Sequence, residues 1–428
     1  MNAESAPQAA GPRLVKLLRG SMVLGVGLTL ATRVTVILTG MLSAIVTART
    51  LGTAGRGEYV YISTLGLLAV QLANFGLSAD NARNAALDPT QTGRLAGNSL
   101  WAAIGLGLVA TAGMAIYHWI NGNGAPLASL AVLIVFVPST LYGLVASNIL
   151  IGLGRMKAFN IYLLASNLFQ LGAILLAGLV SRRPETLLWA SAAAVFASTL
   201  GLFWLFRPQG RDIIRFDAAL MRGGLRFAGR IYVITLLGFA ITRVNVLMLG
   251  AMSSKTELGV YSVAMQFGDA LMLLPGTIAM MLFPELVKAQ RNGGILGPTL
   301  RAAGWTIAFL LPSVVALWLL APFIMHTLFG PEFIPAAQVL RIMLPGVFAL
   351  GVASIFSQAL AADGVPPQQI AVWVVAGAVI VGSNMIFIPA YGAVGAAMSF
   401  ACSYTLAAIG LVGLVLWRAR LARVKTTD

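Results

Sequence analysis

The sequence predicts an all-α protein that crosses a membrane about twelve times, and three features support this fold class. Of its 428 residues, 59% are hydrophobic and only 10% are charged, whereas about a quarter of the residues of a soluble protein are charged. The mean hydropathy is +0.89. The apolar residues also occur in runs of about 20, which is the length that a helix needs to span the hydrocarbon layer.

The charge balance of the chain is strongly positive, with a formal net charge of +15. In a soluble protein such an excess suggests nucleic-acid binding, but this chain has no long basic run and no soluble domain to carry one. In membrane proteins, basic residues instead concentrate in the loops that face the cytoplasm. We therefore expect no nucleic-acid partner.

Cysteine and histidine are too few for a disulfide or for a typical metal site. Cys402 is the single cysteine, and His118 and His326 are the two histidines. The sequence also lacks a P-loop, an H-E-x-x-H motif and a G-x-S-x-G motif. We therefore expect no catalytic residue, no metal ligand and no bound cofactor, and we expect that the protein is not an enzyme.

The chain begins with a polar and then basic stretch, MNAESAPQAAGPRLVKLLRG. The apolar segment that follows is longer than the core of a signal peptide, about 7–15 residues, and has no clear cleavage site. We interpret it as the first, uncleaved spanning helix. The twelve apolar segments lie near 21–46, 58–79, 97–120, 126–151, 158–180, 185–206, 228–250, 258–283, 302–321, 337–361, 367–388 and 393–417.

The connections between these segments are short, and the longest one covers 207–227. This connection looks amphipathic, so we expect it to lie along the membrane surface. With the N-terminus placed in the cytoplasm, nineteen Lys and Arg residues fall in inside segments and five in outside loops. This bias predicts that both termini are cytoplasmic.

The chain also repeats itself weakly. A G-x-Y pair opens the second span at Gly57 and recurs at Gly259 in the eighth, and a glycine before the fifth span, Gly154, recurs as Gly364 before the eleventh. Repeats in this order indicate two six-span halves, 1–206 and 228–428, joined by the linker 207–227. Because six is even, the halves share one topology and are related by an axis along the membrane normal.

Four stretches carry a family resemblance: ARTLGTAGRGEYVYI, ANFGLSADNAR, LFGPEFIPAAQVLRIMLPG and IPAYGAVGAAMSF. They resemble the polysaccharide-exporter branch of the multidrug/oligosaccharidyl-lipid/polysaccharide (MOP) superfamily, and the nearest match is the Wzx-type repeat-unit flippase. The resemblance covers essentially the whole chain. Its motifs are mostly apolar and glycine patterns, so they identify the fold better than the substrate.

The resemblance implies two six-helix bundles, as in MATE transporters, around a central cavity that opens to alternate sides. It implies a substrate of undecaprenyl-pyrophosphate carrying a few sugars, moved from the cytoplasmic to the periplasmic leaflet for O-antigen or exopolysaccharide synthesis. The expected location is a bacterial inner membrane, and the expected partners include a polysaccharide polymerase and chain-length machinery. Transport of this kind needs no cofactor, although a proton or sodium gradient can drive it.

Four arginines, Arg33, Arg230, Arg243 and Arg341, lie within the predicted spans, and two of them lie well away from the span ends. Arg33 is near the middle of the first span, and Arg243 lies about two-thirds along the seventh, the matching helix of the second half. An arginine at the centre of a spanning helix costs about 2.5–3.5 kcal/mol on insertion scales, so it usually faces a cavity or a partner. Its planar fork binds two phosphate oxygens at once. Both arginines are candidates for pyrophosphate binding, or else they bridge helices through carbonyls or Asp269.

Asp269 is the one carboxylate deep in a span, and Gln266 shares its helical face. Asp269 either carries a coupling ion or serves as a fixed counter-ion to an arginine. The other candidates for substrate binding are Arg230, at the inner end of the seventh span, and amides that suit sugar hydroxyls. These amides are Gln71, Asn74 and Asn245. Helix packing is the alternative for the amides, and snorkelling to the interface is the alternative for Arg230.

Three other functions remain alternatives. A multidrug or cation antiporter, or a lipid II-type flippase, would keep the fold and change the cargo. An antiporter of cations would need an acidic cavity, whereas this chain has several arginines and one aspartate within its spans. A membrane polymerase or glycosyltransferase would need a sizeable outer loop or an exposed acidic motif, and every predicted outer loop is short.

Overall fold

The computed structural model describes residues 12–121, 127–291, 294–364 and 366–424. Within these ranges nearly all residues are helical and no strand occurs. A helix satisfies its backbone N–H and C=O groups within its own segment, which is what a chain needs where lipid offers no hydrogen-bond partner. The predicted all-α fold class is confirmed.

The helices follow one another in two groups. The first comprises α1 (Pro12–Asn74), α2 (Leu77–Leu87), α3 (Thr92–Asn121), α4 (Leu127–Ala131), α5 (Leu133–Gly152), α6 (Met156–Val180) and α7 (Pro184–Leu205). The second comprises α8 (Ala218–Met252), α9 (Lys255–Leu271), α10 (Leu273–Arg291), α11 (Leu296–Ile324), α12 (Ala336–Ala362) and α13 (Pro367–Val424). Short helical segments η1 (Pro89–Gln91), η2 (Arg207–Ile214), η3 (Met325–Phe329) and η4 (Pro331–Phe333) lie between them.

Among the described residues, nine helices are long and apolar enough to cross a membrane. Two of the nine, in α1 and α13, contain a glycine with positive φ: Gly52 with φ 68° and Gly392 with φ 55°. Only glycine adopts such a conformation readily, and each one changes the direction of the chain, so each helix holds two crossings. The apolar part of α8, Gly238–Met252, adds another. The count agrees with about twelve spans.

The linker is shorter than the sequence suggests. α8 begins at Ala218, so residues 218–227 form the first turns of a spanning helix and not a separate surface segment. Asp217 caps this helix, because its Oδ1 accepts hydrogen bonds from the N–H groups of Ala219 and Leu220, each at 3.1 Å. Capping of this kind satisfies backbone donors that otherwise lack a partner. Only 206–217 remains between the two groups of helices.

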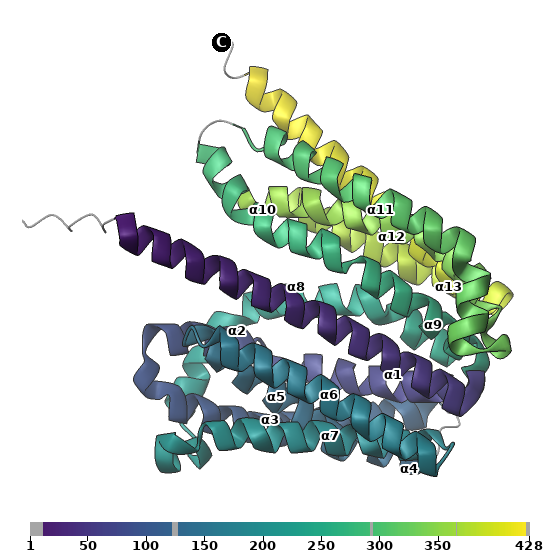
Figure 1. Ribbon diagram of the computed structural model, residues 1–428, viewed down its shortest axis with the longest axis horizontal. Coiled ribbons are helices and arrows are strands. Elements are labelled where there is room, and N and C mark those ends of the chain that lie inside the picture. Colours follow the sequence, from purple (N-terminus) through teal and green to yellow (C-terminus); the bar gives the residue numbers. More distant parts are fainter. Residues whose placement is uncertain (1–11, 122–126, 292–293, 365, 425–428) are drawn as a thin grey trace, which may run out of the picture.

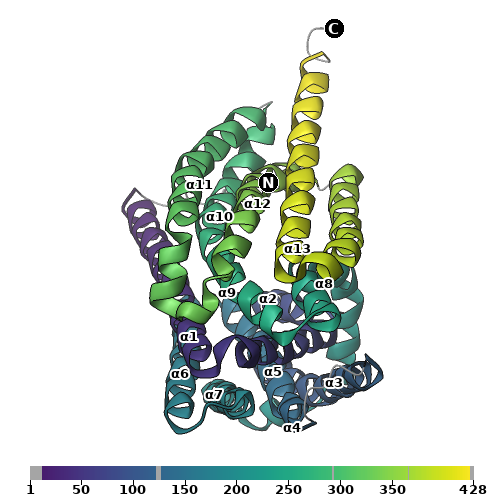
Figure 2. The same cartoon turned by 90° about the vertical axis from the view of Figure 1, so that its right-hand side faces the viewer.

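The two groups of helices form two lobes that meet at one end of the molecule and diverge toward the other (Figures 1 and 2). We call the end that contains Gly52 and Gly392 the closed end, and the end that contains Pro12 and Val424 the terminal end. The turns at Gly154 and Gly364, which correspond in the two halves, both have positive φ, 67° and 92°. The same local conformation therefore recurs at matching places in each lobe.

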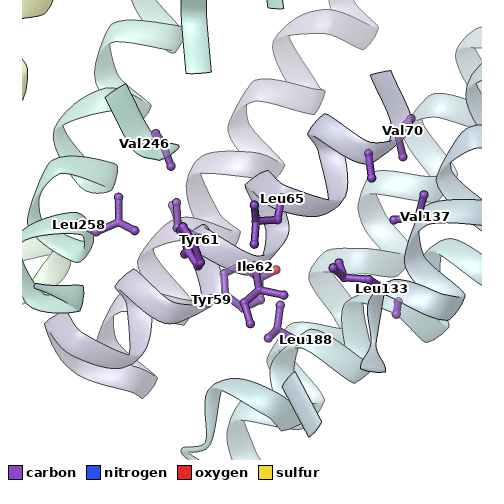
Figure 3. Close-up of a cluster of buried hydrophobic side chains, with 14 of the residues drawn as sticks. Tyr59, Tyr61, Ile62, Leu65, Val70, Leu133, Val137, Leu188, Val246 and Leu258 are labelled. Atoms are coloured by element: carbon purple, nitrogen blue, oxygen red, sulfur yellow. The ribbon is translucent and has the colours of Figure 1, made fainter. Parts of the chain in front are cut away.

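At the closed end, one hydrophobic core joins the two lobes. Figure 3 shows Tyr61 of α1 on the side of Leu258 and Val246 of the second lobe, and Ile62 of α1 on the side of Leu188 of the first; all five are at most 5% exposed. A second cluster of buried residues lies wholly within the second lobe, between α10, α11, α12 and α13. The lobes are thus held together at the closed end, and the second lobe has a core of its own.

Candidate functional site

An ion pair links the first two helices of the second lobe. Arg243 of α8 places Nη1 3.5 Å from Oδ2 of Asp269 on α9, and Nη2 is also 3.5 Å from that oxygen. The Asp269 side chain is 53% exposed and the Arg243 side chain 28%. The pair is therefore open on one side, and Asp269 partly neutralises Arg243 without enclosing it.

Arg33 of α1 faces the same region from the first lobe. A Cβ built on Gly40 would lie 3.6 Å from Nε2 of Gln266, so this face of α1 is turned toward α9. Arg33 precedes Gly40 by seven residues, which is nearly two helical turns, and so it lies on the same face about 10 Å further along the axis. Gln266 is one turn from Asp269 on α9. The arginine of one lobe and the ion pair of the other therefore lie on facing helices.

The Arg33 side chain is exposed and forms no hydrogen bond or ion pair with the described side chains. Two guanidinium groups and one carboxylate leave this region with one excess positive charge. A cation at the depth of a spanning helix is unfavourable unless water or an anion meets it. The arrangement therefore suits an anionic ligand that reaches between the lobes.

The amides that we predicted from the sequence lie in different surroundings. Asn74 is 4% exposed and bonds Ser78, whose backbone N–H donates to Asn74 Oδ1 at 3.2 Å, so it supports the turn between α1 and α2. Asn245 is 2% exposed and donates to the hydroxyl of Tyr261 at 2.9 Å and to the carbonyl of Ala396 at 3.2 Å. These contacts favour the helix-packing alternative for both amides.

The structure also places Gln71, Arg230 and Arg341, three further residues of the predicted spans. Gln71 is half-buried on α1. Arg230 belongs to α8, and its side chain lies outside the described part of the structure. Arg341 donates from Nε to the carbonyl of Trp318 at 2.8 Å and stacks 4.7 Å above the ring of that residue, which joins α12 to α11. Of the candidates, the structure pairs Arg243 with Asp269 and places Arg33 and Gln266 on the facing helices α1 and α9.

Sequence reasoning missed a set of polar contacts between the lobes at the closed end. Lys255 Nζ lies 3.0 Å from Oε2 of Glu58, and Arg56 Nε lies 3.3 Å from the hydroxyl of Ser262. Arg49 donates from Nε to the carbonyl of Leu328 at 2.8 Å. The sequence places Arg49, Arg56 and Lys255 in predicted outside loops, where their charges bear only on the predicted topology. The G-x-Y repeat was the available signal, because it marks this crossing point of α1 and α9.

The glycines of that repeat lie against each other. A Cβ on Gly57 would overlap the carbonyl oxygen of Lys255, and a Cβ on Gly259 would overlap that of Thr53. The contact is symmetrical, because Lys255 precedes Gly259 and Thr53 precedes Gly57 by four residues each. Glycine is required where backbones approach so closely. The helices α1 and α9 therefore cross in direct backbone contact at Gly57 and Gly259.

Comparison with known proteins identifies a family and several structures of similar fold. Residues 22–290, more than half of the chain, match the family model described as polysaccharide biosynthesis protein. No curated protein matches the chain in sequence.

Several solved structures share the fold. A multidrug resistance MATE family transporter of the MOP superfamily in an inward-facing conformation has a TM-score of 0.72 at 16% identity, over 92% of this chain and 96% of that chain. The lipid II flippase MurJ in an inward closed conformation has a TM-score of 0.71 at 11% identity, over 92% and 87%. A MOP superfamily transporter from Pyrococcus furiosus, described as having a binding pocket of reverse polarity, has a TM-score of 0.57 at 15% identity, over 92% and 96%.

Proposed function

Because the chain belongs to the polysaccharide biosynthesis protein family and has the fold of the MOP transporters, we propose that it is a flippase for undecaprenyl-pyrophosphate-linked oligosaccharides. Family and fold together point to a multi-pass membrane transporter. The proposal adds the cargo, which is a repeat unit for a surface polysaccharide such as O-antigen or exopolysaccharide. It also adds the location, a bacterial inner membrane with both termini in the cytoplasm.

The observation that supports this cargo is the exposed guanidinium of Arg33 opposite the open ion pair of Arg243 and Asp269. A pyrophosphate diester carries two negative charges, and guanidinium groups bind such oxygens in pairs and remain charged at any physiological pH. A cationic drug would meet repulsion from the excess positive charge at the same place. The arrangement thus favours the lipid-linked sugar over the cation of a multidrug antiporter.

The lobes suggest how transport proceeds. With the terminal end in the cytoplasm, the diverging lobes admit the pyrophosphate and the sugars from that side, and the closed end blocks the periplasm. Outward opening requires the Glu58–Lys255 and Arg56–Ser262 contacts to separate while the lobes approach each other at the terminal end. The guanidinium groups stay at mid-membrane and hold the anion throughout.

Asp269 acts as a counter-ion in this proposal. Its carboxylate already pairs with Arg243, which allows the second lobe to carry an arginine at this depth before the cargo arrives. The incoming pyrophosphate then competes with Asp269 for Arg243. Consumption of the product outside, by a polymerase and its chain-length machinery, supplies the direction.

The test is transport by the purified protein in liposomes, measured as the appearance of undecaprenyl-pyrophosphate-linked sugar in the outer leaflet. We expect Arg33→Gln to lower the rate by about 10- to 100-fold, since a hydrogen bond to a charged group contributes about 1.5–3 kcal/mol. Arg33→Lys keeps the charge and loses the fork, so it should retain part of the rate. Arg182→Ala, in an exposed loop, is the matched control and should transport normally.

Two outcomes would reject the proposal. Wild-type protein that moves no lipid-linked sugar but exchanges organic cations for protons would be an antiporter. Wild-type protein that lengthens glycans in the membrane would be an enzyme. Normal transport by Arg33→Gln would show that Arg33 does not bind the cargo, and the family assignment would still hold.

A further inference from the structure

A cavity of about 490 Å³ lies in the second lobe, between α8, α12 and α13, and no function described so far uses it. This volume is within the range of about 300–1,000 Å³ that is typical of small-molecule sites. Its lining is almost wholly apolar and includes Ile241, Leu350, Trp373 and Val374. Val374 is 54% exposed, so the cavity opens to the surface of the spanning helices.

One buried polar side chain belongs to the wall of the cavity. Tyr404 lines it and is 1% exposed, and its hydroxyl has no hydrogen-bond partner in the described structure. A buried hydroxyl without a partner is costly, so such a group usually awaits a ligand or a water molecule. The apolar cavity therefore offers a ligand one polar group in its wall.

The register of α8 places the cavity next to the ion pair of Arg243 and Asp269. Thr242 lines the cavity, and the next residue, Arg243, turns to Asp269 on α9. Successive residues of a helix point about 100° apart, so one turn of α8 forms both the wall of the cavity and a guanidinium of the charged site. A single ligand can therefore place its hydrocarbon part in the cavity and its anionic group at Arg243 only if the anionic group is joined directly to the hydrocarbon.

We propose that this cavity binds the first isoprene units of the lipid carrier, next to the pyrophosphate that Arg243 holds. The inference rests on the proposed function and adds a second recognition element to it. An allylic diphosphate has the required sequence of chemistry, because its hydrocarbon chain begins at the phosphate-bearing carbon. A phospholipid differs, since a glycerol unit separates its phosphate from the acyl chains.

Gly238 offers a direct test, because it lines the cavity and a Cβ built on it meets no atom within 4 Å. Gly238→Leu fills part of the cavity. Gly238→Ala is the matched control, because it restricts the backbone as much as Gly238→Leu does but adds little volume. The experiment measures binding of farnesyl diphosphate, farnesol and inorganic pyrophosphate to the purified full-length protein. Intrinsic fluorescence or calorimetry serves as the readout.

We expect farnesyl diphosphate to bind the wild type at least tenfold more tightly than either pyrophosphate or farnesol. Gly238→Leu should weaken farnesyl diphosphate by tenfold or more and leave pyrophosphate unchanged, and Gly238→Ala should bind both as the wild type does. Arg243→Gln should weaken both anionic probes. A photoreactive farnesyl diphosphate should label peptides that contain Ile241 or Val374.

Other results would overturn the inference. Equal affinity for farnesol and farnesyl diphosphate would make the cavity a general site for membrane lipid, and equal competition by phosphatidic acid would do the same. Unchanged binding of farnesyl diphosphate by Gly238→Leu would place the hydrocarbon elsewhere. If liposome transport of lipid-linked sugar is normal in the wild type while these binding results fail, the inference is wrong and the proposed function stands. If transport itself fails, the proposed function is wrong.

Discussion

Lys255 and Glu58 form an ion pair of 3.0 Å across the two lobes, and Glu58 also accepts a hydrogen bond of 3.0 Å from the hydroxyl of Ser129. Glu58 thus links α1 to α9 and to α4 at the closed end. The Lys255 side chain is 40% exposed and that of Glu58 is 13% exposed, so the pair is only partly screened by solvent.

Loss of this ion pair should shift the protein toward opening at the closed end. We expect Glu58→Gln to favour the open arrangement by about 1 kcal/mol or less, as for a partly exposed pair. Spin labels at Arg182→Cys and Met252→Cys, in a Cys402→Ser background, would report the change as a larger population of long distances. Unaltered distance distributions in Glu58→Gln and in Lys255→Gln would show that the pair does not hold this end.

The glycine contact between the lobes predicts a stronger effect. Gly57→Ala and Gly259→Ala each put a methyl group into a facing backbone carbonyl, so the closed end cannot form as it stands. We expect each variant to reach the membrane and to lose most of its transport, and the labels described above should show separation of the lobes. Gly172→Ala, where a Cβ meets no atom within 4 Å, is the control. Normal transport by both glycine variants would show that the facing backbones move apart at little cost in free energy.

The counter-ion role of Asp269 predicts rescue in a double variant. Asp269→Asn leaves Arg243 without its partner, and we expect a lower melting temperature and a lower membrane yield. The double variant Arg243→Gln/Asp269→Asn should recover stability, with an interaction energy of about 0.5–3 kcal/mol in the cycle. Thermal unfolding of the four purified proteins measures this. A coupling role for Asp269 would appear instead as loss of any dependence on an ion gradient with stability unchanged.

The amide of Asn98 bonds both backbone groups of one linker residue, Asp217. Asn98 of α3 accepts from the backbone N–H of Asp217 at 2.7 Å and donates to its carbonyl at 2.9 Å. Asn98→Ala removes both bonds from a side chain that is 5% exposed, and we expect a loss of about 1–3 kcal/mol of stability. Asn98→Asp is informative as well, since it retains the acceptor and loses the donor. Thermal unfolding of both variants should place Asn98→Asp between the wild type and Asn98→Ala.

Asp217 makes the same region sensitive to acid. Backbone N–H groups at the start of α8, chiefly that of Leu220, and the nearby Arg94 hold the pKa of Asp217 below its usual range. A carboxyl with a lowered folded pKa stabilises the fold above its unfolded pKa of about 3.9, and this contribution disappears as the pH falls through the folded value. Asp217→Asn should therefore reduce the acid-induced fall in melting temperature. If the melting temperatures of the wild type and Asp217→Asn fall equally with decreasing pH, Asp217 does not cause the acid sensitivity.

The sequence predicted the number of crossings and the arginine positions for physical reasons. A spanning helix needs a continuous apolar run, and an arginine interrupts such a run visibly, so Arg33 and Arg243 were evident without a structure. The sequence allows Arg243 to pair with Asp269 but does not decide it, because the two residues are 26 apart and only the packing of α8 on α9 brings them together.

Other features were out of reach for equally physical reasons. Asn74 and Asn245 carry the amide groups that suit sugar hydroxyls, but a buried amide forms hydrogen bonds with whichever neighbours the packing provides. Here the partner of Asn74 is Ser78, and the partners of Asn245 are Tyr261 and Ala396. The start of α8 was missed because its first turns are polar and basic and resemble a surface linker. Its cap at Asp217 was the overlooked signal.

The attachments of α8 have a mechanical consequence. Tyr232 donates to the carbonyl of Leu72 at 2.8 Å and stacks on Phe75 of the first lobe, whereas Asn245, further along the same helix, bonds Ala396 of the second. One continuous helix is therefore anchored to a different body at each end. Under the proposed rocking mechanism, α8 has to bend between these anchors, and the bending stiffness of this helix then contributes to the rate of transport.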